Sequence, residues 1–149
     1  MRVNTQPVLE GISIMFRNFS GKEGRFNAAG KRNFCARLTD DMAAQLEDEG
    51  WAVKYLEPRE EGDRRVPYIK VNVSFGKVPP KLYLVTKGGI TPLTEETVNM
   101  LDYAEIANVD LVLRPYNWDE NGTAAPSAYV KSMYVTVVED PLEEKYANS

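Results

Sequence analysis

Alternation of apolar and polar residues predicts that most of this chain forms β-strands. In the segment 8–19, Ile12, Ile14 and Phe16 alternate with polar positions, so we expect these three side chains to face a core. The same pattern predicts further strands over 31–38, 51–56, 67–75, 81–87, 109–116 and 127–138. We expect 81–87 to pair with 67–75 across the turn at 76–80. In 67–75, Tyr68 and Lys70 fall on the polar face.

Helix signals occur in two segments. The segment 39–49 begins with Thr39, a good cap, continues with two aspartates that favour the helix N-terminus, and is followed by Gly50. A second helix is expected from 91–101, with Thr94 as its cap and two glutamates in its first turn. The strand and helix segments do not alternate regularly, so a doubly wound parallel sheet is excluded.

The order of elements favours a mainly β, α+β fold with two helices. If the first helix is an insertion, the remainder matches a five-stranded barrel with a helix between its third and fourth strands. This is the oligonucleotide-binding (OB) fold, in which nucleic acid lies across the sheet between two loops. Those loops would be 20–30 and 116–126. We expect the domain to span 1–138 and to be followed by an acidic tail, 139–149.

Composition narrows the function classes. With 149 residues and 43% hydrophobic residues, the chain can form one domain with a substantial core. It lacks an apolar run of the ~20 residues that a membrane span needs and shows no signal-peptide pattern. We therefore expect a cytoplasmic protein without a membrane partner. Cys35 is the only cysteine, which rules out an internal disulfide and fits a reducing compartment.

Histidine is absent, which removes the commonest general base and metal ligand. No phosphate-binding or dinucleotide-binding glycine motif occurs either. The sequence therefore predicts a protein that is not an enzyme, with no catalytic residues, metal or cofactor. The remaining enzymatic alternative is a Mg²⁺-dependent nuclease that uses Asp102, Glu105 or Asp110.

The segment 17–37 is basic and aromatic within an acidic protein. It contains six cations and one acid, a net charge of +5, whereas the whole chain has a net charge of −4. Cations neutralise phosphates and flat rings stack on unpaired bases, so this composition indicates binding to single-stranded nucleic acid. A solvated polar hairpin is the alternative interpretation. The candidate DNA-binding residues, with strand and loop positions elsewhere included, are Arg17, Phe19, Lys22, Arg25, Phe26, Lys31, Arg32, Phe34, Tyr68, Lys70, Trp118 and Lys131.

The three phenylalanines of this segment differ in how well they suit stacking. Phe26 lies in the middle of a glycine-containing loop with no apolar alternation around it, so it is the best candidate. Phe34 shares its strand face with Ala36 and Leu38, which makes a core position equally compatible with the pattern. Phe19 is intermediate between the two. We expect the glycines of the loop to make it mobile in the free protein.

Several stretches resemble the single-stranded-DNA-binding proteins of tailed bacteriophages, particularly phages of actinobacteria. They are Phe16-Arg-Asn-Phe-Ser-Gly-Lys, Arg32-Asn-Phe-Cys, Gly50-Trp-Ala-Val-Lys, Pro58-Arg-Glu-Glu-Gly-Asp and Leu111-Val-Leu-Arg-Pro-Tyr. The similarity covers roughly residues 8–147. It implies an OB-type barrel that coats single strands without sequence preference during DNA replication or recombination. A phage protein of this kind would act in the cytoplasm of the host cell.

The resemblance also suggests a role for the C-terminal tail. Related proteins end in an acidic tail with a terminal aromatic residue, which recruits partners and competes with DNA. Here Glu143, Glu144 and Tyr146 are the candidate partner-binding residues, for replication or recombination proteins. The chain departs from that pattern because it does not end on an aromatic residue, so a solvated end is the alternative.

Other functions remain open at this stage. A phage structural or assembly protein could use the same small β-barrel, with the basic aromatic loop as a protein interface. An RNA-binding barrel would differ only in its preference for the 2′-hydroxyl. The sequence is compatible with a homo-oligomer and does not decide between oligomeric states.

Overall fold

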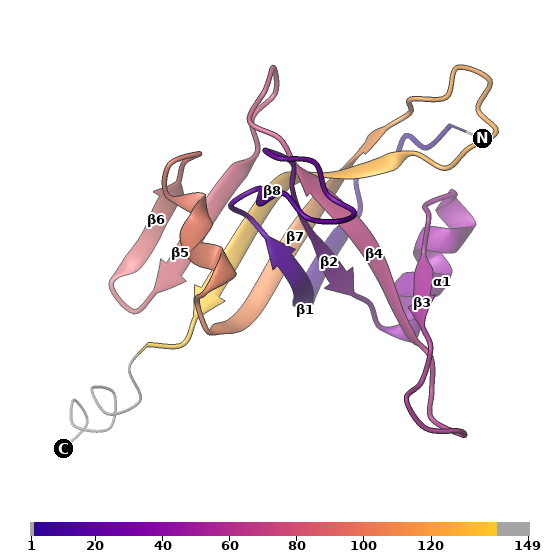
Figure 1. Ribbon diagram of the computed structural model, residues 1–149, viewed down its shortest axis with the longest axis horizontal. Coiled ribbons are helices and arrows are strands. Elements are labelled where there is room, and N and C mark those ends of the chain that lie inside the picture. The colour runs from indigo at the N-terminus through magenta and orange to yellow at the C-terminus, as the bar shows by residue number, and fades with distance from the viewer. Residues whose placement is uncertain (1, 140–149) are drawn as a thin grey trace.

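The fold is mainly β, as a computed structural model describing residues 2–139 shows (Figure 1). Its α-helix is α1 (Asp40–Glu49) and its 3₁₀-helix is η1 (Val98–Asp102). The strands are β1 (Val8–Asn18), β2 (Arg32–Arg37), β3 (Lys54–Leu56), β4 (Val66–Val73), β5 (Lys81–Thr86), β6 (Gly89–Leu93), β7 (Ile106–Tyr116) and β8 (Ser127–Val137). The predicted strands therefore all exist, and β6 is an addition to them.

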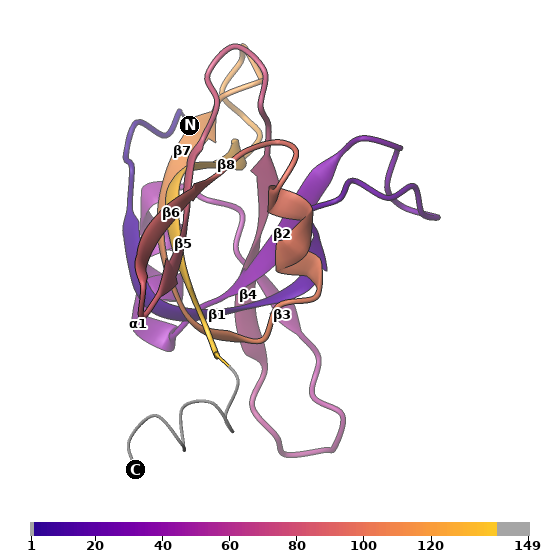
Figure 2. The ribbon, with the colours of Figure 1, turned by 90° about the vertical axis from the view of Figure 1, so that its left-hand side faces the viewer.

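Five of the strands are paired in a continuous circuit. β1 pairs with β2, β2 with β4, β7 with β8 and β1 with β7, all antiparallel. A short parallel pairing joins β4 to β8 at Val71–Ala128 and Asn72–Tyr129. The circuit β1–β2–β4–β8–β7 therefore returns to β1, and Figure 2 shows the strands surrounding the centre of the molecule.

The first helix begins and ends where the sequence predicted. The Thr39 hydroxyl accepts a hydrogen bond from the Met42 amide, and Gly50 ends the helix in the left-handed conformation at φ +100°. Leu46 and Ala43 are its buried side chains. Trp51, which follows Gly50, is only 4% exposed and belongs to the core. Figure 1 shows α1 beside β3 at one end of the molecule.

The second predicted helix is wrong as an α-helix. The segment instead forms β6 and then η1, a single 3₁₀ turn. Thr94 does begin a local turn, because its carbonyl accepts the Thr97 and Val98 amides. Pro92 lies opposite Tyr83 in an antiparallel pairing of β6 with β5, so the residues before Thr94 are extended. The described residues thus contain one α-helix rather than two.

The predicted partner of β5 is also wrong. β5 lies parallel to β8, from the pair Lys81–Ser132 to the pair Val85–Thr136, and does not form a hairpin with β4. Its other neighbour is β6. β5 and β6 therefore extend the sheet beyond the five-strand circuit, at the opposite end of the molecule from α1 (Figure 1).

Phe19 and Phe34 lie at the centre of the core. Both are fully buried, and their rings stack with centroids 5.2 Å apart at 23°. They pack with the inward-facing residues of β4, β7 and β8, such as Val71, Leu113 and Val130. The prediction that Phe19 stacks on bases is wrong, because its ring does not reach the surface. Of the two positions that the sequence left open for Phe34, base stacking or the core, the structure shows the core.

Phe16 reverses the expectation for β1. The predicted alternation holds for Ile12 and Ile14, which contact the core, but Phe16 is 64% exposed. The register of β1 against β2 shifts between Met15 and Asn18, so Phe16 and Arg17 together oppose one residue of β2. Phe16 also has φ +52°, the single positive value among the described non-glycine residues. A β-bulge therefore interrupts the alternation after Met15, so Phe16 does not face the core as the sequence pattern predicted.

We predict that Phe34→Ala lowers the free energy of unfolding by about 3–5 kcal/mol, the cost of removing a large buried aromatic side chain. Phe26→Ala is the matched control. It removes the same ring from a position that is 89% exposed, and its effect should stay within about 0.5 kcal/mol. Urea denaturation followed by circular dichroism measures both. Equal effects of the two substitutions would contradict the core position of Phe34.

Candidate nucleic-acid interface

The outer face of the β1–β2–β4 sheet is polar and lies opposite the core. Residues facing one another on paired strands share a face. Three rows cross the strands: Ser13, Arg37, Tyr68 and Lys54; Met15, Cys35 and Lys70; and Asn18, Asn33, Asn72, Tyr129 and Arg114. We call these twelve residues the outer face. The prediction that Tyr68 and Lys70 point away from the core is confirmed by the burial of Ile69 and Val71 between and beside them.

The outer face is electropositive. Its rows contain four cations, Arg37, Lys54, Lys70 and Arg114, and none of its twelve residues is an aspartate or glutamate. The pKa of the Cys35 thiol reflects this charge. Burial raises the pKa, and the nearby ammonium groups of Lys70 and Lys54 act in the opposite direction and lower it. A polyanion crossing these strands would therefore meet cations without a competing carboxylate.

A groove continues the outer face at the junction of β4 and β8. Asn72, which belongs to the third row, lines it together with Lys31, Arg32, Phe75 and Tyr129. The Asn72 side-chain amide donates to the Ala128 carbonyl at 3.2 Å, which holds the two parallel strands together. The groove thus combines two cations with two aromatic rings. Lys31 is exposed, whereas Tyr129 is half-buried.

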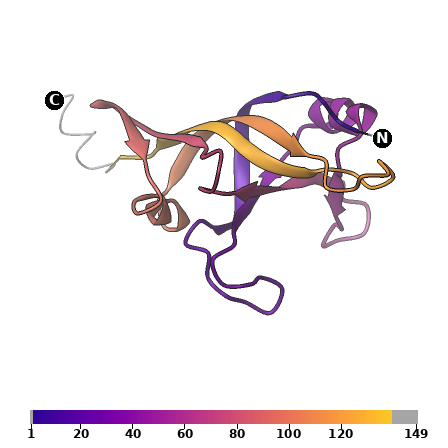
Figure 3. The ribbon, with the colours of Figure 1, turned by 90° about the horizontal axis from the view of Figure 1, so that it is seen from above.

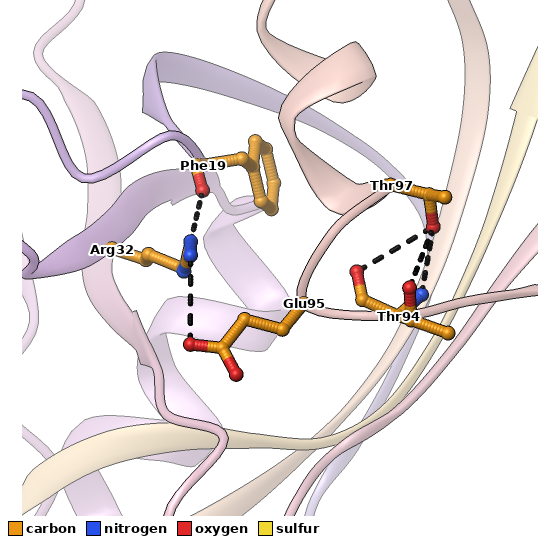
Figure 4. A network of polar contacts seen from close by, with 5 residues as sticks. All are labelled: Phe19, Arg32, Thr94, Glu95 and Thr97. Atoms are coloured by element: carbon orange, nitrogen blue, oxygen red, sulfur yellow. Dashed lines mark hydrogen bonds and ion pairs between the residues drawn. The ribbon is translucent and has the colours of Figure 1, made fainter.

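Arg32 is fixed in this groove by contacts on several sides (Figure 4). Its guanidinium donates to the Phe19 carbonyl at 3.1 Å and lies 3.8 Å from the Glu95 carboxylate. It also lies over the Phe75 ring, 5.5 Å from the centroid. Only 16% of its side chain is exposed, so a phosphate would contact one edge of an already positioned guanidinium. Glu95 is the acid that a bound phosphate would have to displace or tolerate.

The loop between β1 and β2 is crossed by hydrogen bonds. The Asn27 side-chain amide donates to the carbonyls of Lys22, Ala28 and Lys31, and the Gly30 amide donates to the Gly21 carbonyl at 2.8 Å. Gly21 is required there, because a Cβ would approach the Gly30 backbone to 3.0 Å at φ +70°. The loop projects from the body of the molecule, as Figure 3 shows. Its mobility in the free protein stays a prediction.

Phe26 is presented at the tip of this loop. It is 89% exposed, and Arg25 lies over its ring at 5.3 Å from the centroid. A mutual bridge between Gly24 and Asn27 forms the turn that carries both residues. An exposed ring beside a cation is suited to a base and its phosphate. Phe26 therefore has the exposure that the sequence predicted.

Lys22, at the base of the loop, is held by Tyr103. Its ammonium donates to the Tyr103 hydroxyl at 2.9 Å and lies 5.6 Å from the ring centroid. This hydrogen bond is the main reason that the pKa of Lys22 is raised above its ordinary value. Tyr103 is 76% exposed, so the pair forms a cation and a ring on the surface beside η1.

The second loop, between β7 and β8, is organised by Asp119. Its carboxylate accepts hydrogen bonds from the Thr123 hydroxyl at 2.7 Å and from the amides of Asn121, Thr123 and Ala124. These bonds, that from the Thr123 hydroxyl first, lower the pKa of Asp119. Trp118 precedes it and is 54% exposed. Tyr116 lies edge-on to Tyr129, with centroids 6.2 Å apart, and so connects this loop to the groove.

Lys131 belongs to a separate hollow on the β8 side. Its ammonium donates to the Gln6 side-chain oxygen at 2.6 Å. Lys81 and Arg114 line the same hollow with Val78 and Pro79. Arg114 is also the last member of the third row and lies 5.3 Å from the Tyr129 ring centroid. The outer face, the groove and this hollow therefore follow one another along the surface.

Arg17 is the remaining correction among the predicted residues. One guanidinium nitrogen donates to the Leu101 carbonyl at 2.8 Å and to the Ala104 carbonyl at 2.6 Å, so this side chain holds β1 against η1. Its half-buried position and these two bonds give it a structural role instead of the predicted contact with phosphate. The position of Arg17 in the basic, aromatic segment 17–37 suggested a nucleic-acid contact. The bulge at Phe16 and Arg17 instead places the Arg17 side chain against the segment 101–104.

Sequence reasoning missed several members of the interface. Arg37 and Lys54 were not among the predicted DNA-binding residues. The direction of Arg37 could have been predicted, because its neighbours Ala36 and Leu38 are apolar and buried. Lys54 could be placed only once β3 was known to pair with β4. Phe75 and Tyr129 meet Arg32 and Arg114 through the parallel β4–β8 pairing, and no local pattern in the sequence indicates that pairing.

Comparison with known proteins identifies the family. Residues 2–149 match the sequence model described as "Putative phage ssDNA-binding domain". The chain belongs to this phage ssDNA-binding family. Among curated protein sequences, none is significantly similar to the chain. The match confirms the resemblance noted from the sequence, and it confirms single-stranded DNA as the ligand class of this family member.

The fold is also similar to a solved structure. It superposes on the C-terminally truncated single-stranded DNA-binding protein from bacteriophage Enc34 with a TM-score of 0.52. The superposition covers 90% of this chain and 87% of the other, at 9% sequence identity. The likeness therefore concerns the β-rich fold, while the side chains of the interface are those of this chain.

Two of the three acids proposed for a nuclease, Asp102 and Asp110, have structural roles. The Asp102 carboxylate accepts the amides of Phe19 and Ser20, and Asp110 accepts the Gly11 amide. Within residues 2–139 no three acids, cysteines or histidines gather as metal ligands would. The ssDNA-binding family is a family of binding domains, which gives no support to the nuclease alternative. No helix in the described part of the chain has the length and apolar character to cross a membrane.

The lowered pKa of Asp119 predicts the pH range in which the second loop is ordered. A carboxyl with a lowered pKa stabilises the folded arrangement above its ordinary pKa, and this contribution is lost as the pH falls through the lowered value. The amide resonances of Asn121, Thr123 and Ala124 should therefore shift together with a midpoint below 3.8, the ordinary value. A pH titration by NMR measures this, with Asp119→Asn as the control that lacks the transition. A midpoint at or above 3.8 would contradict the hydrogen-bonded carboxylate.

Proposed function

We propose that this protein binds single-stranded DNA without sequence preference, through phosphate neutralisation and base stacking, during phage DNA replication or recombination. The observation that carries the proposal is the outer face, which combines four cations with Tyr68 and Tyr129 and contains no carboxylate. The loops that present Phe26 and Trp118 flank it. Cations and exposed rings on one continuous surface are what a flexible polyanion with unpaired bases requires.

The pairing pattern supports assignment to the OB fold. In that fold five strands form a Greek-key barrel and nucleic acid lies on the face between two loops. Here β1, β2, β4, β7 and β8 would be the five strands, and η1 would occupy the place of the helix between the third and fourth. Two insertions then remain: α1 with β3, and the β5–β6 hairpin. The loops that begin after β1 and after β7 are the two that flank the binding face in this fold.

The proposed path of the strand follows the three rows and the groove. Lys54, Arg37 and Lys70 would neutralise phosphates on the outer face, and Lys31 and Arg32 would do so in the groove. Arg25, Lys22 and Lys131 would add contacts at the margins. Bases would stack on Phe26, Tyr68, Tyr129 or Trp118, each worth about 1–3 kcal/mol. Stacking tolerates any base because every base has a π-face, so the arrangement favours coating over recognition of a sequence.

The acidic remainder of the chain supports the same function. The whole chain has a net charge of −4 although the outer face holds four cations and no acid, so the rest of the protein would repel DNA and confine binding to the outer face. A duplex would meet the same cations but would offer no unpaired bases to the rings. The proposed preference for single strands therefore comes from stacking, and the phosphate contacts supply affinity.

The first test is a fluorescence-anisotropy titration of labelled oligo-dT at several salt concentrations, with duplex and RNA of equal length as competitors. We expect affinity to fall with salt by a slope of about −0.7 per neutralised phosphate. Lys70→Ala should make that slope shallower by about 0.7 and weaken binding to all sequences alike. Lys87→Ala, a change of the same kind at the far end of β5, is the control and should bind like the natural protein. Affinity that is flat with salt, or absent at low salt, would contradict the proposal and favour a structural or assembly protein.

We further propose that the acidic tail competes with DNA and contacts replication or recombination proteins. Glu143, Glu144 and Tyr146, the residues predicted for this role, lie outside the described residues. The tail begins with Glu139, whose carboxylate accepts the Lys87 amide at 2.7 Å and holds the end of β8 beside β5. Its acidic composition supports electrostatic competition for the cationic face.

Removal of residues 140–149 should tighten binding of oligo-dT modestly at low salt and leave it unchanged at high salt, where screening removes the competition. Truncation after Glu139 preserves its bond to Lys87. The anisotropy titration above measures the effect, and replacement of Glu143 and Glu144 by glutamine in the full chain serves as the charge control. Equal affinity of the full and shortened chains at low salt would leave the tail without a role in DNA binding.

A further inference from the structure

Phe16 combines three properties that are rarely found together in a large apolar residue. Its side chain is 64% exposed, its backbone is left-handed at φ +52°, and it lies in a β-bulge. A bulky non-glycine residue in the left-handed region is destabilising, and such a conformation persists only where the surrounding contacts enforce it. An aromatic ring so placed in water also forgoes the burial that normally stabilises it.

The contacts that enforce this conformation are on both sides of the bulge. The Arg17 guanidinium donates to the carbonyls of Leu101 and Ala104, and the Asp102 carboxylate accepts the amides of Phe19 at 2.6 Å and Ser20 at 3.0 Å. The chain immediately after Phe16 is therefore tied to η1 and the residues directly after it by four hydrogen bonds. Before it, Met15 remains in register with Cys35. Phe16 is thus held between two fixed points.

The position of Phe16 relates it to the outer face. Met15 is the β1 member of the row that also contains Cys35 and Lys70, and Phe16 is the next residue along β1. Asn18, two residues further on, begins the row that leads to Asn72 and Tyr129. Phe16 therefore stands at the β1 margin between two rows of the cationic surface.

We propose that Phe16 is a base-stacking residue, fixed at the β1 margin of the outer face by the hydrogen bonds of Arg17 and Asp102. This inference rests on the proposed function and adds an aromatic contact on a strand to the rings carried by the loops. The bulge keeps the Phe16 ring out of the core and exposes it to a base, and the backbone that carries this ring is already ordered. A pre-positioned ring loses less conformational entropy on binding than a ring on a loop that must first be ordered.

Four substitutions separate stacking from other roles of Phe16. Phe16→Gly removes the ring and suits the left-handed backbone, so this variant should unfold at an equal or higher urea concentration than the natural protein. Phe16→Leu keeps apolar bulk without a π-face, whereas Phe16→Tyr and Phe16→Trp keep the ring. We expect Phe16→Gly and Phe16→Leu to bind oligo-dT about 5- to 100-fold more weakly, and the two aromatic variants to bind within about threefold of the natural protein.

Photo-crosslinking supplies a second readout. An oligonucleotide that carries 5-iodouracil, irradiated in complex with the full chain, should crosslink to the peptide that contains Phe16, and this crosslink should disappear in Phe16→Leu. If Phe16→Gly and Phe16→Leu bind oligo-dT as tightly as the natural protein does, the role of Phe16 in stacking is contradicted. The proposed function is then unaffected, because the natural protein still binds. Unchanged DNA binding with altered sedimentation of these variants would also overturn it, because Phe16 would then contact a protein. Failure of the natural protein to bind would instead contradict the proposed function.

Discussion

The exchange of hydrogen bonds between the end of β1 and η1 is the constraint on which much of this structure depends. Arg17 of β1 donates to the carbonyls of Leu101 in η1 and of Ala104 just after it, and Asp102 of η1 accepts two amides from the residues after β1. Each side chain satisfies backbone groups that the local structure leaves unpaired. This reciprocal contact fixes where β1 ends and directs Phe19 into the core. It also sets the base from which the first loop projects.

The same contact explains why the second predicted helix does not form, although the strands and α1 do. The strands and α1 follow from local signals, namely period-two alternation and a Thr–Gly pair of caps, and these signals agree with the final fold. Thr94 and the glutamates after it are equally good local signals for a helix. However, β6 precedes Thr94 and pairs with β5, and Asp102 accepts the amide of Phe19 just after β1. Between these two fixed points there is room for a short 3₁₀-helix only. Tertiary contacts that cannot be seen in a window of residues decided this segment.

The candidate interface was predictable where a side chain's direction follows from alternation. Tyr68 and Lys70 point outward because Ile69 and Val71 point inward, and Phe26 is exposed because nothing apolar surrounds it in the loop. Arg17 and Phe19 could not be assigned in this way. A bulge of one residue reverses the faces of a strand, and the sequence has no marker for the bulge at Phe16, where a glycine would have been the usual sign.

The arrangement divides two requirements of sequence-independent binding between different parts of the molecule. The strand pairing fixes the backbone positions from which Arg37, Lys70 and Lys54 extend toward the same face. The rings of Phe26 and Trp118 lie on the two loops and are 89% and 54% exposed, so a base of any size can reach them. Cations contact phosphates and rings contact any base, and neither kind of contact distinguishes one sequence from another. The proposed lack of sequence preference therefore follows from the types of side chain that the fold brings to this surface.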